Sequence, residues 1–139
     1  MAHRDQSNLL EPKKAVYSDI DLAFLSHPIN GKLTRKLNRE AVKQSVKSLI
    51  LTDYYERPFN GRIGCSIRGL LFENFHPAII QQMENAIREV ISNYEPRAEV
   101  VAVNIQAKPD SHTLNASIVF FTRNDTEPTT LNVSLERVR

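Results

Sequence analysis

The sequence predicts an α+β fold, in which an antiparallel three-stranded C-terminal meander packs against a long helix and shorter N-terminal helices. Apolar residues recur at helical spacing from Pro77 to Asn93, whereas apolar and polar residues alternate from Val100 to Arg123. The segment Tyr94-Glu95-Pro96-Arg97 lies between the two patterns. Pro96 enforces the change, because it has no N–H to continue a helical ladder and it favours an extended preceding residue.

Length and composition indicate a single domain. The chain has 139 residues, of which 41% are hydrophobic, and this share is enough for one core. We expect residues 16–139 to form that domain and the polar residues 1–15 to form a flexible arm. The sequence has neither a long apolar run nor the apolar core of a signal peptide, so we expect no membrane partner and synthesis in a cytoplasm.

The charge of the chain is nearly balanced. Its 18 basic and 16 acidic residues give a formal net charge of +2, which does not by itself imply a polyanion, and we expect no nucleic-acid partner. Basic residues do gather between Lys32 and Lys47. A solvated helix face explains this cluster, and an anionic partner surface is the alternative.

The first third of the domain contains a short extended segment, a loop and a helix. Alternation over residues 16–22 suits an extended segment, whose Asp19 and Asp21 we interpret as turn-forming carboxylates. Residues 24–37 contain Pro28 and an Asn-Gly pair and are predicted to be a loop. A helix is expected over residues 38–52, with Asn38 as its N-cap.

The middle of the chain supplies the remaining helices. Residues 53–64 are predicted to be a structured loop, and residues 65–75 to contain a short helix with Cys65 as a buried thiol. Pro77 then opens the long helix at its favoured first position. Its core-facing stripe is expected to consist of Ile80, Met83, Ile87, Val90, Ile91 and Tyr94.

Three alternating runs separated by turn signals predict the meander. One face of the sheet is expected to carry Val101, Val103, Ile105 and Ala107 from the first strand, Leu114, Ala116, Ile118 and Phe120 from the second, and Leu131, Val133 and Leu135 from the third. The last strand alternates these with Asn132, Ser134 and Glu136. Such an edge strand, with polar outer residues, is available for pairing with another chain.

No residue pattern predicts catalysis or a bound cofactor. The acids have no spacing that pairs two carboxylates for glycoside hydrolysis, and the four histidines lack the spacing of a metal site. No Gly-x-Ser-x-Gly elbow and no phosphate-binding loop is present. We therefore expect no catalytic residue, no metal and no cofactor.

The order of several short motifs resembles that of a known family. Tyr17-Ser18-Asp19-Ile20-Asp21 is followed by Arg57-Pro58-Phe59, by Leu71-Phe72-Glu73-Asn74, and by a Pro-opened helix that ends in Glu95-Pro96-Arg97. This order resembles the GPW/gene-25 family, the baseplate wedge proteins of contractile phage tails, and their relative TssE of type VI secretion. The resemblance covers roughly residues 16 to 139.

The resemblance implies a structural subunit of the tail baseplate that is located in the virion and assembled in the host cytoplasm. Its expected partners are the helical core bundle of the wedge, the tail sheath protein and the tail tube. The family's docking motif maps onto Glu95, Pro96 and Arg97. The subunit would template the first sheath ring, and the open strand carrying Asn132, Ser134 and Glu136 would pair with sheath.

Alternatives remain for the turn and for the whole chain. Arg97 has a planar fork suited to carboxylates, and a stiff turn would hold it ready for docking. Alternatively, Glu95 and Arg97 form a solvated ion pair that contributes about 0–1 kcal/mol. Because some family members are labelled lysozyme-like, a peptidoglycan-cleaving tail lysozyme is the alternative function, and a cytoplasmic adaptor is a third.

Overall fold

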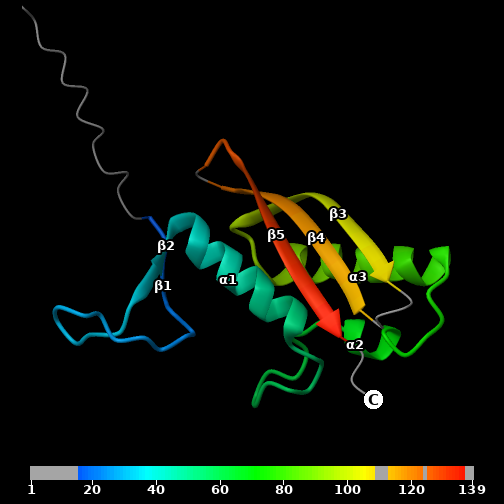
Figure 1. Cartoon of the computed structure of the whole chain (residues 1–139), viewed down its shortest axis with the longest axis horizontal. Coiled ribbons are helices and arrows are strands. Elements are labelled where there is room, and N and C mark those ends of the chain that lie inside the picture. Colours follow the sequence, from blue (N-terminus) through cyan, green and yellow to red (C-terminus); the bar gives the residue numbers. More distant parts are fainter. Residues whose placement is uncertain (1–15, 109–112, 124, 137–139) are drawn as a thin grey trace, which may run out of the picture.

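The computed structural model describes residues 16–108, 113–123 and 125–136. Its elements follow the order β1 (Ser18–Ile20), β2 (Arg35–Leu37), α1 (Asn38–Leu51), α2 (Ile67–Leu70), α3 (Pro77–Tyr94), β3 (Ala98–Lys108), β4 (Thr113–Thr122) and β5 (Pro128–Glu136). The predicted α+β class is confirmed (Figure 1). The proposed arm, residues 1–15, lies outside the described residues.

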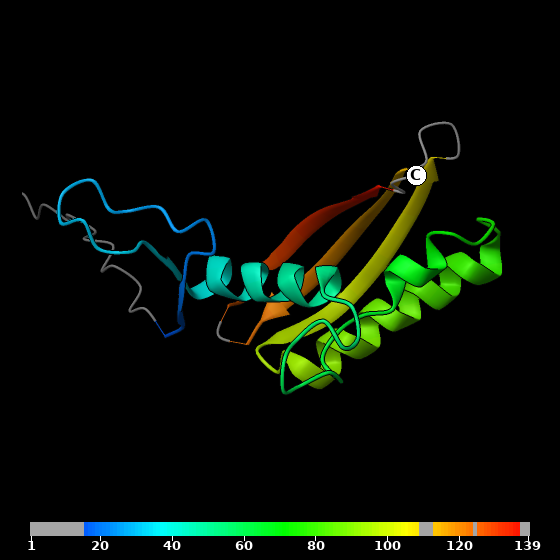
Figure 2. The same ribbon diagram turned by 90° about the horizontal axis from the view of Figure 1, so that it is seen from below.

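The C-terminal strands form one antiparallel sheet in the order β3-β4-β5, as predicted. Helices α1 and α3 lie on the same face of this sheet (Figure 2). Between them and the sheet lies one apolar core, whose largest fully buried side chains include Phe120, Ile118, Leu114, Met83 and Ile87. No described helix is long and apolar enough to cross a membrane.

The expected facing of the first C-terminal strand is wrong at one residue. Val103 and Ile105 are buried, whereas Val101 is 52% exposed. The pairing of β3 with β4 shifts register between Val100 and Ala102. Such a bulge adds a residue to one strand, and the facing of the residues before it is therefore reversed.

The predicted stripe of the long helix is mostly confirmed. Met83, Ile87, Val90 and Ile91 are buried, and the helix begins at Pro77 as expected. Tyr94 at its last turn is half exposed, and its hydroxyl donates to the carbonyl of Arg62 at 2.9 Å. Of residues 65–75 only Ile67–Leu70 are helical, and Cys65 is buried as predicted.

The expected loop over residues 24–37 is wrong at its end, because β2 pairs there with β1 in antiparallel register. A further bridge joins Ser26 to Leu33. Residues 16–37, which we call the N-terminal hairpin, extend beyond the body of the molecule in both views (Figures 1 and 2). The sequence misses this hairpin because its strands have three residues each, too few to show a period.

Asn38 does not cap α1 as expected. Leu37 occupies the cap position, and Asn38 has φ +46°, a left-handed conformation that Asn tolerates better than most residues. Its side-chain oxygen accepts the N–H groups of Val16 at 2.8 Å and Tyr17 at 3.2 Å. Asn38 therefore joins the start of the hairpin to the start of α1.

Candidate partner-binding site

The Glu95-Pro96-Arg97 turn begins where α3 ends. The N–H of Glu95 still donates to the carbonyl of Ile91 at 2.8 Å, and the N–H of Ala98 donates to the carbonyl of Glu95 at 3.0 Å. Pro96 cannot continue the helix, so the chain reverses and enters β3. The turn therefore lies between the core helix and the first strand of the sheet, and both hold it in place.

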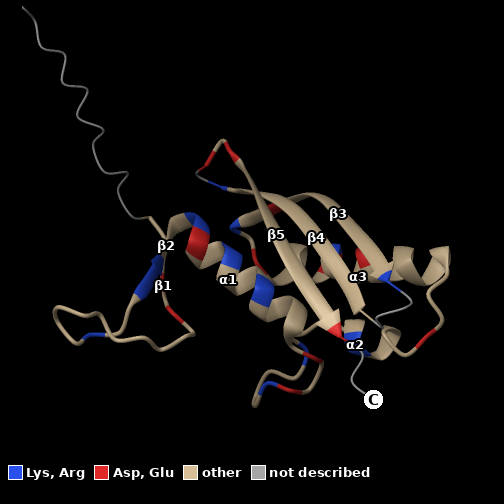
Figure 3. Ribbon diagram, in the orientation of Figure 1, with Lys and Arg blue, Asp and Glu red and all other residues tan. Residues whose placement is uncertain are grey.

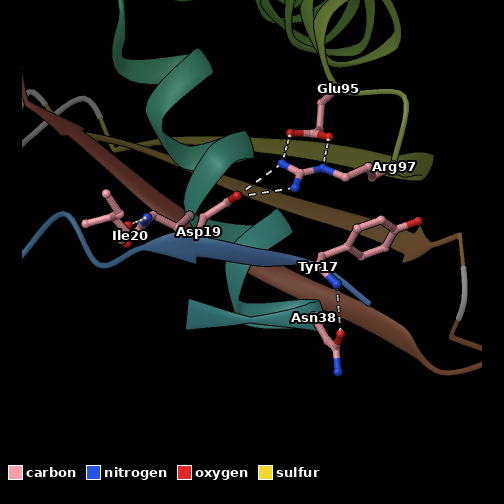
Figure 4. A network of polar contacts seen from close by, with 7 residues as sticks. Tyr17, Asp19, Ile20, Asn38, Glu95 and Arg97 are labelled. Atoms are coloured by element: carbon pink, nitrogen blue, oxygen red, sulfur yellow. Dashed lines mark hydrogen bonds and ion pairs between the residues drawn. The ribbon is translucent and has the colours of Figure 1, made fainter. Parts of the chain in front are cut away.

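Glu95 and Arg97 form a close bidentate pair (Figure 4). The Arg97 Nε donates to Glu95 Oε1 at 2.7 Å, and Nη2 donates to Oε2 at 2.8 Å. Glu95 is only 3% exposed, whereas the exposed fraction of the Arg97 side chain is 25%. The alternative in which Glu95 and Arg97 form a solvated ion pair is wrong, because the Glu95 carboxylate is buried.

Arg97 has two further partners, both from the N-terminal hairpin. Its Nη1 and Nη2 each lie 3.3 Å from Asp19 Oδ2, and its guanidinium carbon lies 5.5 Å from the centre of the Tyr17 ring. Asp19 is thus not a turn-forming carboxylate, as we expected, but an ion-pair partner 78 residues away in sequence. Asp21 does have the expected role, since its Oδ1 accepts the N–H of Ala23 at 3.0 Å.

The electrostatics of the pair favour the charged forms of both groups. Burial raises the pKa of Glu95, but hydrogen bonds from Arg97 and Ser45 outweigh it and leave this pKa below its ordinary value. The hydrogen bond to Glu95 raises the pKa of Arg97. The pair is therefore a fixed ionic contact over the ordinary pH range.

A hollow of about 460 Å³ lies beside this turn, and the exposed Pro96 forms part of its lining. Besides Arg97, its lining includes Arg88 from α3 and Arg123, which directly follows β4, and Glu99 is its one acid. Three arginines around an exposed proline suit a surface that carries carboxylates.

The other predicted partner residues lie elsewhere. Exposed and buried residues alternate along β5, and the exposed ones include Asn132, Ser134 and Glu136. β4 lies between β5 and β3, so the structure does not bring these residues together with the turn. The sequence therefore predicts two surfaces, and the structure keeps them separate.

A second hollow, of about 760 Å³, lies between α1 and β5. Its lining includes three lysines, two leucines and a stretch of β5, namely Lys36, Lys43, Lys47, Leu22, Leu51 and residues 130–132. Figure 3 shows basic residues along this helix. Two members of the expected basic cluster are paired. Arg39 donates to Asp125 at 3.0 Å and to Glu127 at 2.9 Å, and Lys36 Nζ lies 3.3 Å from Asp21 Oδ2.

Sequence reasoning missed Asp19 and Tyr17 as partners of Arg97. Both belong to a short motif that we noted, but no spacing rule relates them to residues 78 or more positions away. Among the described residues, no group of three or more metal-ligating side chains could hold a metal ion.

Residues 37–127 match the family described as baseplate wedge protein gp25. The chain belongs to the gp25 family of baseplate wedge proteins. It is similar to the baseplate wedge protein gp25 of Enterobacteria phage T4, with 35% identity over 105 residues that cover 76% of this chain and 79% of the relative. Family membership supports a structural role in a baseplate.

Solved structures agree with this assignment. A chain of the anti-feeding prophage baseplate has a TM-score of 0.69 and 28% identity, over 80% of this chain and 89% of that chain. A Geobacter sulfurreducens protein described as a candidate tail lysozyme has a TM-score of 0.65 and 20% identity, over 70% of this chain and 89% of that chain. The second likeness, at this identity, shows the fold alone.

Proposed function

We propose that this gp25-family chain is a structural wedge subunit that links the wedge core to the tube and sheath junction and templates the first sheath ring. The observation that carries the proposal is the outer edge of β5. Within the described residues, β5 pairs only with β4, and the hollow against α1 lies alongside it. An extended segment of another protein could add there as a further strand through backbone hydrogen bonds.

The second contact is made by the Glu95-Pro96-Arg97 turn, which docks on the helical core bundle of the wedge. Pro96 and three arginines line the hollow beside this turn, so an apolar ring lies next to cationic side chains there. Glu95 contributes from inside, because it fixes the guanidinium of Arg97 and lowers the entropy cost of docking. Assembly would take place in the host cytoplasm, before the subunit becomes part of the virion.

Co-purification with the wedge core proteins of the same particle tests the turn. We expect the wild type to retain them, and Arg97→Glu and Arg123→Glu to lose them. Arg123 is exposed, so its variant keeps the Glu95 contact and controls for folding. Retention by Arg123→Glu, with a melting curve like that of the wild type, would contradict docking at this turn.

Cross-linking tests the β5 edge. The single natural cysteine, Cys65, is buried, so an Asn132→Cys variant carries one accessible thiol for a benzophenone maleimide. In assembled tails we expect this thiol to cross-link to sheath protein. Asn104→Cys, at an exposed residue on the strand at the opposite edge, is the matched control. Equal cross-linking from both positions would overturn strand addition at β5.

The lysozyme alternative fits the geometry less well. A glycosidase needs one carboxylic acid with a raised pKa, and Arg97 lowers the pKa of Glu95, the most buried carboxylate among the described residues. We expect purified protein to leave peptidoglycan intact. Clearing by the wild type that disappears in a Glu73→Gln variant would instead support the enzyme.

A further inference from the structure

The N-terminal hairpin is a built segment rather than a loose loop. The N–H of Asp21 donates to the carbonyl of Thr34 at 3.1 Å. The N–H of Thr34 donates to the carbonyl of Leu25, also at 3.1 Å. The N–H of His27 closes the tip by donating to the carbonyl of Lys32 at 2.7 Å. The backbone is therefore fixed along its length.

The large apolar side chains between residues 22 and 35 of this hairpin lie in solvent. Ile29 at the tip is 89% exposed, and more than half of each of the other four is exposed, namely Leu22, Phe24, Leu25 and Leu33. The one buried residue of the hairpin is an acid, Asp21. A two-stranded hairpin gains little stability alone, and a cluster of exposed apolar residues commonly marks a contact surface.

The charges on the hairpin indicate what covers it. Its two acids are already paired, Asp19 with Arg97 and Asp21 with Lys36 at 3.3 Å. Among the described residues, Lys32 and Arg35 form no ion pair; with Ile20 and Leu33 they line a hollow of about 670 Å³. The tip thus offers apolar contacts beside unpaired cations and no unpaired acid.

We propose that residues 22–35 dock an apolar segment bearing carboxylates, supplied by a neighbouring baseplate protein, and that the Glu95–Arg97–Asp19 network positions this surface. The surface is additional to the turn and to the β5 edge. This inference rests on the proposed function in one respect: the neighbour is taken to be a baseplate protein.

The positioning part follows from how the hairpin is attached. Arg97 holds Asp19, and Gln44 of α1 accepts the N–H of Leu22 at 3.1 Å and donates to the carbonyl of Ile20 at 2.8 Å. These contacts lie at the base of the hairpin, where the hydrogen bonds of Asn38 and the packing of Tyr17 against the core complete the attachment. Loosening them would leave the tip intact but change its direction.

The test uses the full chain co-expressed with the wedge proteins of the same particle. We expect Leu25→Ser/Ile29→Ser to lower their retention by roughly tenfold, as for residues central to an interface. Lys32→Glu should also lower it, and added salt should weaken the wild-type complex. The control is Phe59→Asn, which removes a fully exposed apolar side chain from the loop after α1, at a residue whose φ of +67° Asn tolerates.

The outcomes separate this proposal from the proposed function. Tip variants that bind like the wild type overturn the docking surface, even if Arg123→Glu and the β5 cross-link behave as expected. A wild-type dimer in sedimentation that dissociates in Leu25→Ser/Ile29→Ser would assign the surface to a second copy and overturn the acidic partner. Loss of binding in the tip variants alone supports the hairpin and counts against docking through the turn.

Hydrogen exchange separates contact from positioning. Asp19→Asn should speed amide exchange in residues 16–37 and weaken binding, whereas Leu25→Ser/Ile29→Ser should weaken binding with exchange unchanged. Unchanged binding in Asp19→Asn, with faster exchange, would overturn the positioning role.

Discussion

The sheet with its helices and the N-terminal hairpin are stabilised in different ways. In the sheet, Leu114, Ile118 and Phe120 are fully buried against α1 and α3. In the hairpin, the aliphatic side chains are exposed, and polar groups such as Asp19 and Gln44 share the attachment with Tyr17, which packs against the core. From this difference we infer that the sheet and its helices, the body of the molecule, fold without the hairpin. The direction of the hairpin, in contrast, depends on a few contacts to the body.

The largest expected effect is the loss of a core ring. Phe120→Ala should lower the free energy of unfolding by about 3–5 kcal/mol, because it removes a fully buried aromatic side chain and leaves a cavity. Phe24→Ala, at the exposed hairpin, should change it by less than about 0.5 kcal/mol. Urea unfolding of the two variants measures the contrast. Similar losses would mean that the hairpin is part of the cooperative core.

The next effect concerns the turn that joins the two regions. Arg97→Ala leaves the carboxylate of Glu95 buried without its partner, and we expect a loss of about 3 kcal/mol. Adding Glu95→Gln should recover part of this stability, because the double variant no longer buries an unpaired negative charge. Denaturant midpoints of the single and double variants form the cycle. No recovery would mean that the charge of Glu95 is compensated elsewhere.

The sequence predicts the region stabilised by apolar packing better than the one held by polar contacts. Periods of 3.6 and 2 residues identify α3 and the strands, because each face meets one environment along its whole length. The β3 bulge escapes this reasoning, since Val101 has the residue type of its buried neighbours.

The candidate site could be predicted only in part. Glu95 and Arg97 stand out because Pro96 fixes their turn, but nothing local shows that Glu95 is buried. Asp19 and Asn38 carry no pattern either, because each acts on a residue about 20 or more positions away that only the fold brings near. Polar contacts between distant segments have no period, so they need the structure.

The pH dependence of stability sharpens the comparison further, with an effect smaller than the loss of Arg97. The pKa of Glu95 is lower in the folded state than its ordinary value of 4.5. Its contribution is therefore present above about pH 4.5 and is lost as the pH falls through the folded pKa. Urea midpoints of the wild type should fall over this range more steeply than those of Glu95→Gln. Parallel curves would show that Glu95 titrates normally.

The smallest effect on stability falls on the contact that joins hairpin to body. Asp19 and Arg97 are partly exposed, and Arg97 Nη2 lies 3.3 Å from Asp19 Oδ2. Asp19→Asn should therefore lower the free energy of unfolding by less than about 1 kcal/mol. Amide exchange should nonetheless rise in residues 16–37 and stay unchanged in β3–β5, because only the hairpin loses an attachment. Asp53→Asn, which removes a similar exposed ion pair with Arg68, is the control. Faster exchange throughout the sheet would show that the hairpin and the body unfold together, and the distinction between the two regions would then be wrong.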